Sequence, residues 1–492
     1  MAPTQTDSAA DSGIKLQKRV LSFPEVLAQS VANMAPSAAM ALLPLFVFAS
    51  AGNGTWLSFA LSLAVLLIVA YCASVFATRI NSAGSVYVWV TRAIGPAAGS
   101  SAGWGLVLGY LFTGIGCALG FEIYGDNFLV GLGVSPTDHV IRAILYIVGG
   151  LGPAIMAVSD IKISQRLAFV LESVSVTIIL ILCIAVYVHS GGVVDTRQLT
   201  LKGAGAGGIV VGMVLAIFAF AGFESAGSLG QEAKNPGRDV TRAMLWSCGI
   251  VGVFYLVVSY AQVYGLGSTF GKSTAPLPQL ASVAGLGWLG HFIAFGITCS
   301  MFACTLACLT AGSRMLLSLG HDGLLPRAFT HTSTRTRAPH IAIFTVAVPM
   351  TLIPVGYVLA GSQDVVLASE MATLATYGFM LAYALVALSA PVYLHKLNEG
   401  TALAWVCGIL GAVTMLFVFY VNWIPTAIPN SIFPGLSWPY WTLPYVFLGW
   451  TALGLGWYLI TKARKPEVIA SAATWGEAAD PAAASEEAAH RY

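Results

Sequence analysis

A single acidic residue, Glu224, lies in an apolar run that extends from Gly207 to Gly230. About 20 apolar residues are enough to cross a bilayer as a helix, so this run predicts a carboxyl group inside a membrane. An ionisable side chain is costly at that depth and is a functional hypothesis by default. Because burial brings an acid toward titration near neutral pH, proton transfer is the chemistry that Glu224 suggests. The alternative is a structural role, in which a protonated Glu224 bonds to non-helical backbone.

The first apolar segment carries an interruption of its own, in the sequence SVANMAPSAAM. Pro36 cannot donate a backbone hydrogen bond and clashes with the preceding turn, so we predict that the helix breaks between Asn33 and Ser37. Upstream, residues 22–25 (Ser-Phe-Pro-Glu) predict a capping box that starts the first half of this helix.

Broken helices suit a carrier, because they expose N–H groups at one end and carbonyl groups at the other. A carboxylate is favoured at the first end and a cation at the second, so a zwitterion can be held at both. Two breaks at corresponding places in two halves of a chain indicate the midplane site of a secondary transporter. We therefore predict a substrate site at the breaks, with backbone donors from residues 37, 38, 222 and 223. Its candidate residues are Asn33, Ala35, Ser37, Ala38, Ala221, Gly222 and Phe223.

The composition predicts a membrane protein. Of 492 residues, 57% are hydrophobic and only 9% are charged, and the mean hydropathy is +0.81. Soluble proteins carry about 25% charged residues. Long continuous apolar runs favour helices over barrel strands, which would alternate. We predict an all-α fold of twelve spans, near residues 23–49, 55–78, 96–124, 140–158, 163–188, 207–231, 241–266, 287–318, 339–360, 366–394, 402–423 and 441–461.

The distribution of basic residues predicts the orientation. With both termini in the cytoplasm, all but four of the 23 Lys and Arg residues fall on the cytoplasmic side; the four are Arg142, Arg197, Lys202 and Lys272. We expect a cytoplasmic segment 1–21, a permease domain 22–465 in the cell (inner) membrane, and a mobile cytoplasmic tail 466–492. The expected partners are a small molecule and the lipid bilayer, and no nucleic acid. The oligomeric state stays open.

Enzyme chemistry has little support in the sequence. HExxH and Walker patterns are absent, and the eight cysteines fall in apolar segments without metal-ligand spacing. We therefore expect no enzyme, no metal and no cofactor.

Four stretches together resemble the amino acid–polyamine–organocation permeases, which have the leucine-transporter-type fold. GFESAG (222–227), followed by QEAKNPGRDVTRAM (231–244), is similar to the sixth span of that family and its inner loop. RINSAGSVYVWVTRAIGPAAGSSAGW (79–104), DIKISQR (160–166) and SRMLLSLGHDGLLPRAF (313–329) resemble its second-to-third, fifth and eighth spans. The resemblance covers nearly the whole chain and implies inverted repeats of spans 1–5 and 6–10, with two spans appended.

The resemblance also implies roles for single residues. The pattern aromatic-x-aromatic-x-Gly-x-Glu-Ser falls on Phe218 to Ser225, which makes Phe218 the aromatic that occludes substrate and Glu224 a proton-sensitive residue. Tyr110 and Thr113 in span three fall where family members close over substrate. Ser175 stands where proton-coupled members carry a Lys, so the identity of the coupling ion stays open.

These patterns predict a secondary transporter for amino acids or related amines that works by alternating access. We expect a proton symporter in which Glu224 and, secondarily, Glu172 in span five carry the proton; sodium is the alternative ion. Glu172 has a second interpretation, as a partner for Arg166 or another basic residue at the inner mouth. A substrate–product exchanger of the same fold is the alternative function, and a non-transporting sensor is a remote one.

Overall fold

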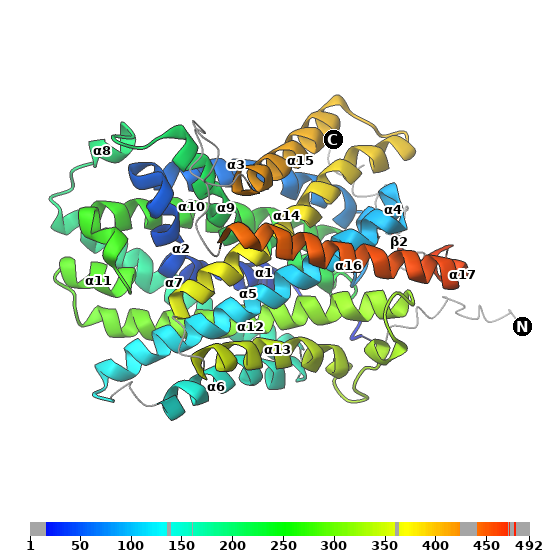
Figure 1. Cartoon of the computed structure of the whole chain (residues 1–492), viewed down its shortest axis with the longest axis horizontal. Helices are drawn as coiled ribbons and strands as arrows, with labels where there is room; N and C mark the ends of the chain where they lie inside the picture. The colour runs from blue at the N-terminus through cyan, green and yellow to red at the C-terminus, as the bar shows by residue number, and fades with distance from the viewer. Residues whose placement is uncertain are drawn as a thin grey trace, which may run out of the picture.

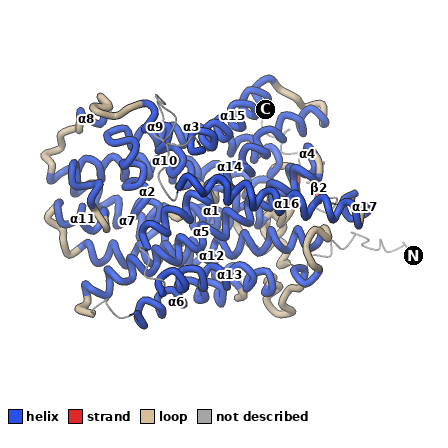
Figure 2. Tube along the Cα trace, viewed as in Figure 1, coloured by secondary structure: helices blue, strands red, loops and turns tan. Residues whose placement is uncertain are grey.

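The computed structural model describes residues 16–134, 139–159, 161–359, 364–423, 440–470, 472 and 477–478. Within them the chain is almost entirely helical, as the apolar runs predict (Figures 1 and 2). The first half comprises α1 (Phe23–Met34), α2 (Pro36–Ala51), the turn η1 (Gly52–Gly54), α3 (Thr55–Ala77), α4 (Val86–Ile94), α5 (Pro96–Gly131), α6 (His139–Ala157), α7 (Ile161–His189) and the short α8 (Thr196–Leu199).

The second half begins with another interrupted span. Its elements are α9 (Ala206–Phe220), the 3₁₀ segment η2 (Phe223–Leu229), α10 (Pro236–Leu266), η3 (Gly267–Lys272), α11 (Pro276–Val283), α12 (Leu289–His321), η4 (Arg327–Thr330), α13 (His340–Leu359), α14 (Asp364–Lys396), α15 (Ala402–Trp423), η5 (Tyr440–Thr442), α16 (Leu443–Arg464) and α17 (Pro466–Ala470).

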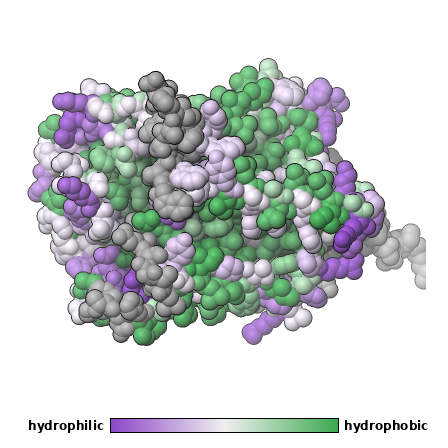
Figure 3. All heavy atoms as spheres, viewed as in Figure 1, coloured by the Kyte–Doolittle hydropathy of each residue, from purple (hydrophilic) through white to green (hydrophobic). Residues whose placement is uncertain are grey.

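The outer surface matches a lipid environment. On the face shown in Figure 3, apolar residues fill the middle of the molecule and hydrophilic residues gather toward its two ends. Large apolar side chains are openly exposed on several helices, for example Ile155 at 67% and Leu453 at 70%. A protein in water rarely exposes apolar patches of such extent, so the surface is that of a membrane protein.

Eleven segments of the described residues are long and apolar enough to cross a membrane. The longest, Phe23–Ala77, has 55 residues, and a continuous helix of that length would measure about 80 Å against a hydrocarbon core of about 30 Å. It contains α1 and α2, then η1, then α3, so the chain turns at Gly52–Gly54. The prediction of twelve spans requires this segment to be divided at that turn.

The core of the bundle depends on a close approach of α5 and α14, which pack against each other extensively. A Cβ on Gly378 would lie 2.4 Å from the carbonyl oxygen of Gly105, so glycine is needed there. The two backbones can meet because neither residue has a side chain. α14 also contacts the interrupted sixth span, where the Gly222 N–H donates to the Tyr383 hydroxyl at 3.1 Å.

A buried ion pair joins three segments at the end of the bundle where α1 begins. The N–H groups of Val20 and Leu21 donate to the Glu232 carbonyl at 2.8 and 2.9 Å, and Leu21 forms a parallel bridge with Ala233. The Glu232 carboxylate accepts two bonds from the Arg314 guanidinium, at 2.7 and 2.9 Å. Their side chains are only 2% and 5% exposed. We call Leu21, Glu232, Ala233 and Arg314 the gate layer.

The same end of the molecule carries part of the C-terminal tail. After α16, the chain forms α17 and then a two-residue strand, β2 (Glu477–Ala478), which pairs antiparallel with β1 (Ile80–Asn81) between α3 and α4. The rest of the tail predicted to be mobile lies outside the described residues, as does most of the predicted cytoplasmic segment 1–21.

Candidate functional site

The first span breaks where Pro36 predicts. α1 ends at Met34, Ala35 adopts the left-handed region with φ 43°, and α2 starts at Pro36. The capping box at the start of α1 is also confirmed, since the Ser22 N–H donates to Glu25 Oε2 at 2.7 Å. The break leaves the first N–H groups of α2 without helical partners.

Those N–H groups are bonded to side chains from two other helices. The Ser37 N–H donates to Glu172 Oε1 at 2.8 Å, and the Ala38 N–H donates to Ser300 Oγ at 3.2 Å. Glu172 thus lies at the break and not at the inner mouth. Arg166 pairs instead with Glu25 at 2.9 Å, so the interpretation of Glu172 as its partner is wrong.

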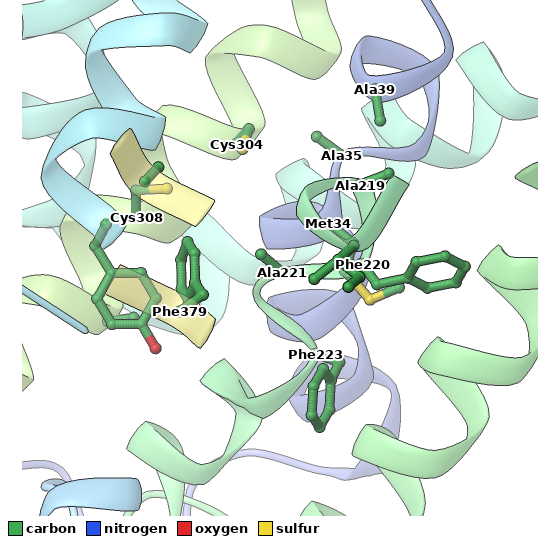
Figure 4. Close-up of a cluster of buried hydrophobic side chains, with 14 of the residues drawn as sticks. Met34, Ala35, Ala39, Ala219, Phe220, Ala221, Phe223, Cys304, Cys308 and Phe379 are labelled. Carbon is green, nitrogen blue, oxygen red and sulfur yellow. The ribbon is translucent and has the colours of Figure 1, made fainter. Parts of the chain in front are cut away.

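The sixth span breaks two residues before Glu224. α9 ends at Phe220, Ala221 is extended, and Gly222 has φ 106°, a conformation that favours glycine. A Cβ on Gly222 would lie 2.6 Å from Asn33 Nδ2, so glycine also allows the two interrupted spans to touch. Figure 4 shows these segments crossing beside each other, with Ala35 in one and Ala221 in the other.

Glu224 is fully buried and connects the sixth span to two other helices. Oε1 accepts the hydroxyl of Tyr110 in α5 at 2.8 Å, and Oε2 accepts the hydroxyl of Tyr383 in α14 at 2.5 Å. The Gly222 N–H lies 3.1 Å from both Oε2 and the Tyr383 oxygen. Three donors therefore surround the carboxylate, and a protonated carboxyl group could not accept all of them equally.

One tyrosine holds the carbonyl ends of both half-helices. The Tyr255 hydroxyl of α10 lies 2.9 Å from the Met34 carbonyl oxygen and 2.6 Å from the Ala219 carbonyl oxygen. These are the groups that the broken helices predict as partners of a cation. Tyr255 is fully buried, so it satisfies part of their hydrogen-bonding capacity inside the protein.

A cavity lies against both breaks. It is lined by Asn33, Met34, Ala35, Ala38, Ala39, Leu42, Leu43, Phe46, Thr113, Gly116, Cys117, Phe218, Ala219, Ala221, Met301, Cys304, Ala368 and Ala372. Its α2 residues run from the break toward the end of the helix, away from the gate layer. The walls carry no Asp, Glu, Lys or Arg side chain, so the cavity accepts apolar groups.

The structure divides the predicted site residues into two groups. Six of them line the cavity: Asn33, Ala35, Ala38, Thr113, Phe218 and Ala221. The other six are buried and do not line it: Ser37, Tyr110, Glu172, Gly222, Phe223 and Glu224. Phe218 is half-buried at the wall, where an occluding aromatic is expected. The described residues contain no group of three His, Cys, Asp or Glu side chains placed to hold a metal ion.

Several residues of the site were not found from the sequence. Tyr383 and Tyr255 have no motif around them, and only the fold brings them to the breaks. Cys117 and Cys304 fall in apolar runs, and the structure shows both of them buried and lining the cavity. Cys304 lies on α12 beside the interrupted spans (Figure 4). Its position in an apolar run gives no signal that distinguishes it from a lipid-facing or core cysteine.

Comparison with known proteins gives consistent matches. A family model described as amino acid permease matches residues 21–451. An uncharacterized transporter of Mycobacterium tuberculosis is 27% identical over 376 residues, which make up 75% of this chain and 79% of that protein. A branched-chain amino acid permease of Bacillus subtilis is 24% identical over 390 residues, 76% of this chain and 81% of that protein.

A solved structure shows the same fold at low sequence identity. The manganese transporter of Eremococcus coleocola matches with a TM-score of 0.55 at 10% identity, over 94% of this chain and 99% of that chain. This likeness supports the leucine-transporter-type fold that the two interrupted spans predict. The relatives are transporters, so the expectation that this chain is not an enzyme is confirmed. The chain belongs to the amino acid permease family of the amino acid–polyamine–organocation superfamily.

Proposed function

We propose that this permease carries a small apolar amino acid together with a proton across the plasma membrane. The observation that carries the proposal is the cavity at the two breaks, whose walls are made of alanine, leucine, methionine, phenylalanine and other uncharged residues. A charged substrate side chain would lose its hydration there without gaining a partner, whereas an apolar side chain loses nothing. The Bacillus subtilis relative, named for branched-chain amino acids, supports the same substrate class.

Transport in this proposal follows alternating access. The gate layer closes one end of the path between α1, η2 and α12, and the cavity extends toward the other end. From the distribution of basic residues, the gate layer faces the cytoplasm and both termini are cytoplasmic. Phe218 covers the substrate from the cavity wall when the site closes.

Glu224 supplies the proton sensitivity of the conformational step. Its carboxylate accepts bonds from Tyr110 and Tyr383, and so connects η2 to α5 and α14. Protonation removes one acceptor and loosens this connection, which links proton binding to movement of the broken span. Proton is thus the proposed driving ion, and sodium is the alternative that the coupling experiment distinguishes.

A ligand screen by thermal shift tests the substrate class, because a ligand stabilises the state that it binds. We expect leucine, valine or alanine to raise the melting temperature of purified protein more than lysine or glutamate does. Screening at pH 5.5 and 7.5 adds the proton linkage, and stabilisation should be larger at the acidic pH. A screen in which only lysine or glutamate stabilises the protein would contradict the substrate class.

The wall of the cavity can be altered to separate a substrate site from a merely structural void. Ala372→Leu adds bulk to the lining, so leucine transport should fall by about 10- to 200-fold relative to alanine transport. The ratio of the two substrates is the internal control, because a folding defect lowers both rates equally. An unchanged ratio of leucine to alanine transport would show that the substrate side chain does not bind in this cavity.

Glu224→Gln tests the proton-sensitive role in liposomes. We expect uptake by this variant to stop following an imposed pH gradient, because glutamine does not titrate. If the Glu224→Gln variant follows the gradient as the wild type does, Glu224 is removed from the proton pathway.

A further inference from the structure

Glu172 occupies an N–H group that the sequence assigns to the carboxylate of a substrate. Its Oε1 accepts the N–H of Ser37, at the start of α2, at 2.8 Å. Its side chain is 1% exposed, and Oε2 has no hydrogen-bond partner among the described residues. A carboxylate of the protein therefore binds the helix N-terminus that would otherwise bind the carboxylate of an amino acid.

The surrounding polar groups are incompletely bonded. Asn33 Nδ2 and Thr113 Oγ1 lack partners within the described part of the chain, and both residues line the cavity. Ala38, the residue after Ser37, lines the cavity as well. Buried donors without partners are costly, and a ligand carboxylate in the cavity would satisfy the Asn33 amide.

The charges around Glu172 make two carboxylates incompatible at this position. Its titratable neighbours are Cys117 of α5, Tyr255 of α10, and Cys299 and Cys304 of α12. None of these side chains is cationic in either protonation state. The structure records no ion pair between Glu172 and a basic residue among those it describes. Two carboxylates sharing such a site cannot both stay ionised.

We propose that Glu172 stands in for the substrate carboxylate in the empty site, and that a bound amino acid displaces it from the Ser37 N–H. The displaced Glu172 takes up one proton from solution, so substrate and proton bind together and the complex gains one positive charge. This inference rests on the proposed function and deepens it: Glu172 accounts for protonation when substrate binds, and Glu224 for protonation when the helices move.

The test measures proton uptake when ligand is added to purified protein in weakly buffered detergent solution. The protein should take up about one proton for each leucine molecule that it binds. The dissociation constant for leucine should rise about tenfold per pH unit at alkaline pH, where this proton is scarce. Isoamylamine, which is leucine without its carboxyl group, should bind without proton uptake by the protein, because it cannot replace Glu172 at the Ser37 N–H. This comparison uses only the wild-type protein.

Variants then assign the proton to a residue. Glu172→Gln should bind leucine without proton uptake and with a pH-independent dissociation constant. The matched control is Glu370→Gln, at a half-buried glutamate of α14, which should keep the uptake. The inference is overturned if Glu172→Gln still takes up a proton, if Glu224→Gln alone abolishes the uptake, or if isoamylamine and leucine behave alike. Leucine binding without proton uptake by the wild type would also overturn it, yet would leave amino acid transport in place.

Discussion

The ion pair of the gate layer should control access to the site from the end of the molecule where α1 begins. Replacing Glu232 by Gln keeps its shape but leaves the Arg314 guanidinium buried without a counter-ion. Both partners are almost fully buried, and the pair is bidentate at 2.7 and 2.9 Å. Breaking such a pair costs about 3–5 kcal/mol, which shifts the closed–open equilibrium roughly 150- to 5,000-fold toward opening.

A buried reporter can measure this shift. Ser228 on η2 is 3% exposed and lies close to Glu232 in the sequence. In a protein whose native cysteines are replaced, Ser228→Cys should react slowly with a membrane-impermeant thiol reagent. Adding Glu232→Gln should raise the labelling rate by up to roughly 150- to 5,000-fold, with the increase ending once the open state dominates. The increase should appear only when the reagent is applied to the gate-layer side.

A matched double variant separates charge from packing. Glu232→Leu combined with Arg314→Met replaces the ion pair by apolar side chains, a change that is often neutral or stabilising. Slow labelling should therefore return in the double variant. Labelling of Glu232→Gln as slow as that of the parent protein, or labelling of the double variant as fast as that of the single one, would show that the ion pair does not hold this end closed.

Three further predictions concern packing, the buried glutamate and pH. Gly378→Ala should destabilise the protein by about 1–3 kcal/mol in thermal unfolding, because its Cβ would lie 2.4 Å from a carbonyl oxygen of α5, whereas Gly356→Ala, with open space around it, should be neutral. Tyr383→Phe deletes a 2.5 Å bond to a carboxylate and should cost about 1.5–3 kcal/mol, while Tyr377→Phe, whose hydroxyl has no partner among the described residues, should cost little; equal losses would contradict this. Burial raises the pKa of Asp195 at the start of α8, but bonds from neighbouring Arg and Gln side chains and a backbone N–H outweigh it, so the pKa lies below its usual range. This contribution to stability is present above about pH 4 and is lost as the pH falls through the folded value, and Asp195→Asn should remove that dependence in acid-unfolding curves.

The sequence predicts the parts of the site that depend on local chemistry. Pro36 predicts the first break, and Gly222, two residues before Glu224, predicts the second, so both interruptions could be located without the structure. Other prolines, such as Pro44 and Pro391, stand inside helices and give no break. The capping box of Ser22 and Glu25 is likewise a property of four consecutive residues. Apolar length predicts the spans for the same reason, since crossing a membrane depends on local composition.

The partners of Glu224 and Glu172 could not be predicted, because they come from distant helices. Tyr383 is 159 residues from Glu224 in the chain, and Glu172 is 135 residues from Ser37. A tyrosine in an apolar span has the same local pattern whether it faces lipid or a buried carboxylate. The helix packing that decides between these positions, such as the contact of α5 with α14, is a property of the fold.

The most direct test of proton-coupled amino acid transport is leucine uptake by wild-type protein in liposomes that contain no amino acid. With an acidic exterior and a more alkaline lumen, leucine should accumulate above its external concentration, and collapsing the pH gradient should release it. Uptake that requires liposomes preloaded with an amino acid, and that is unaffected by the pH gradient, would identify an exchanger and contradict the account.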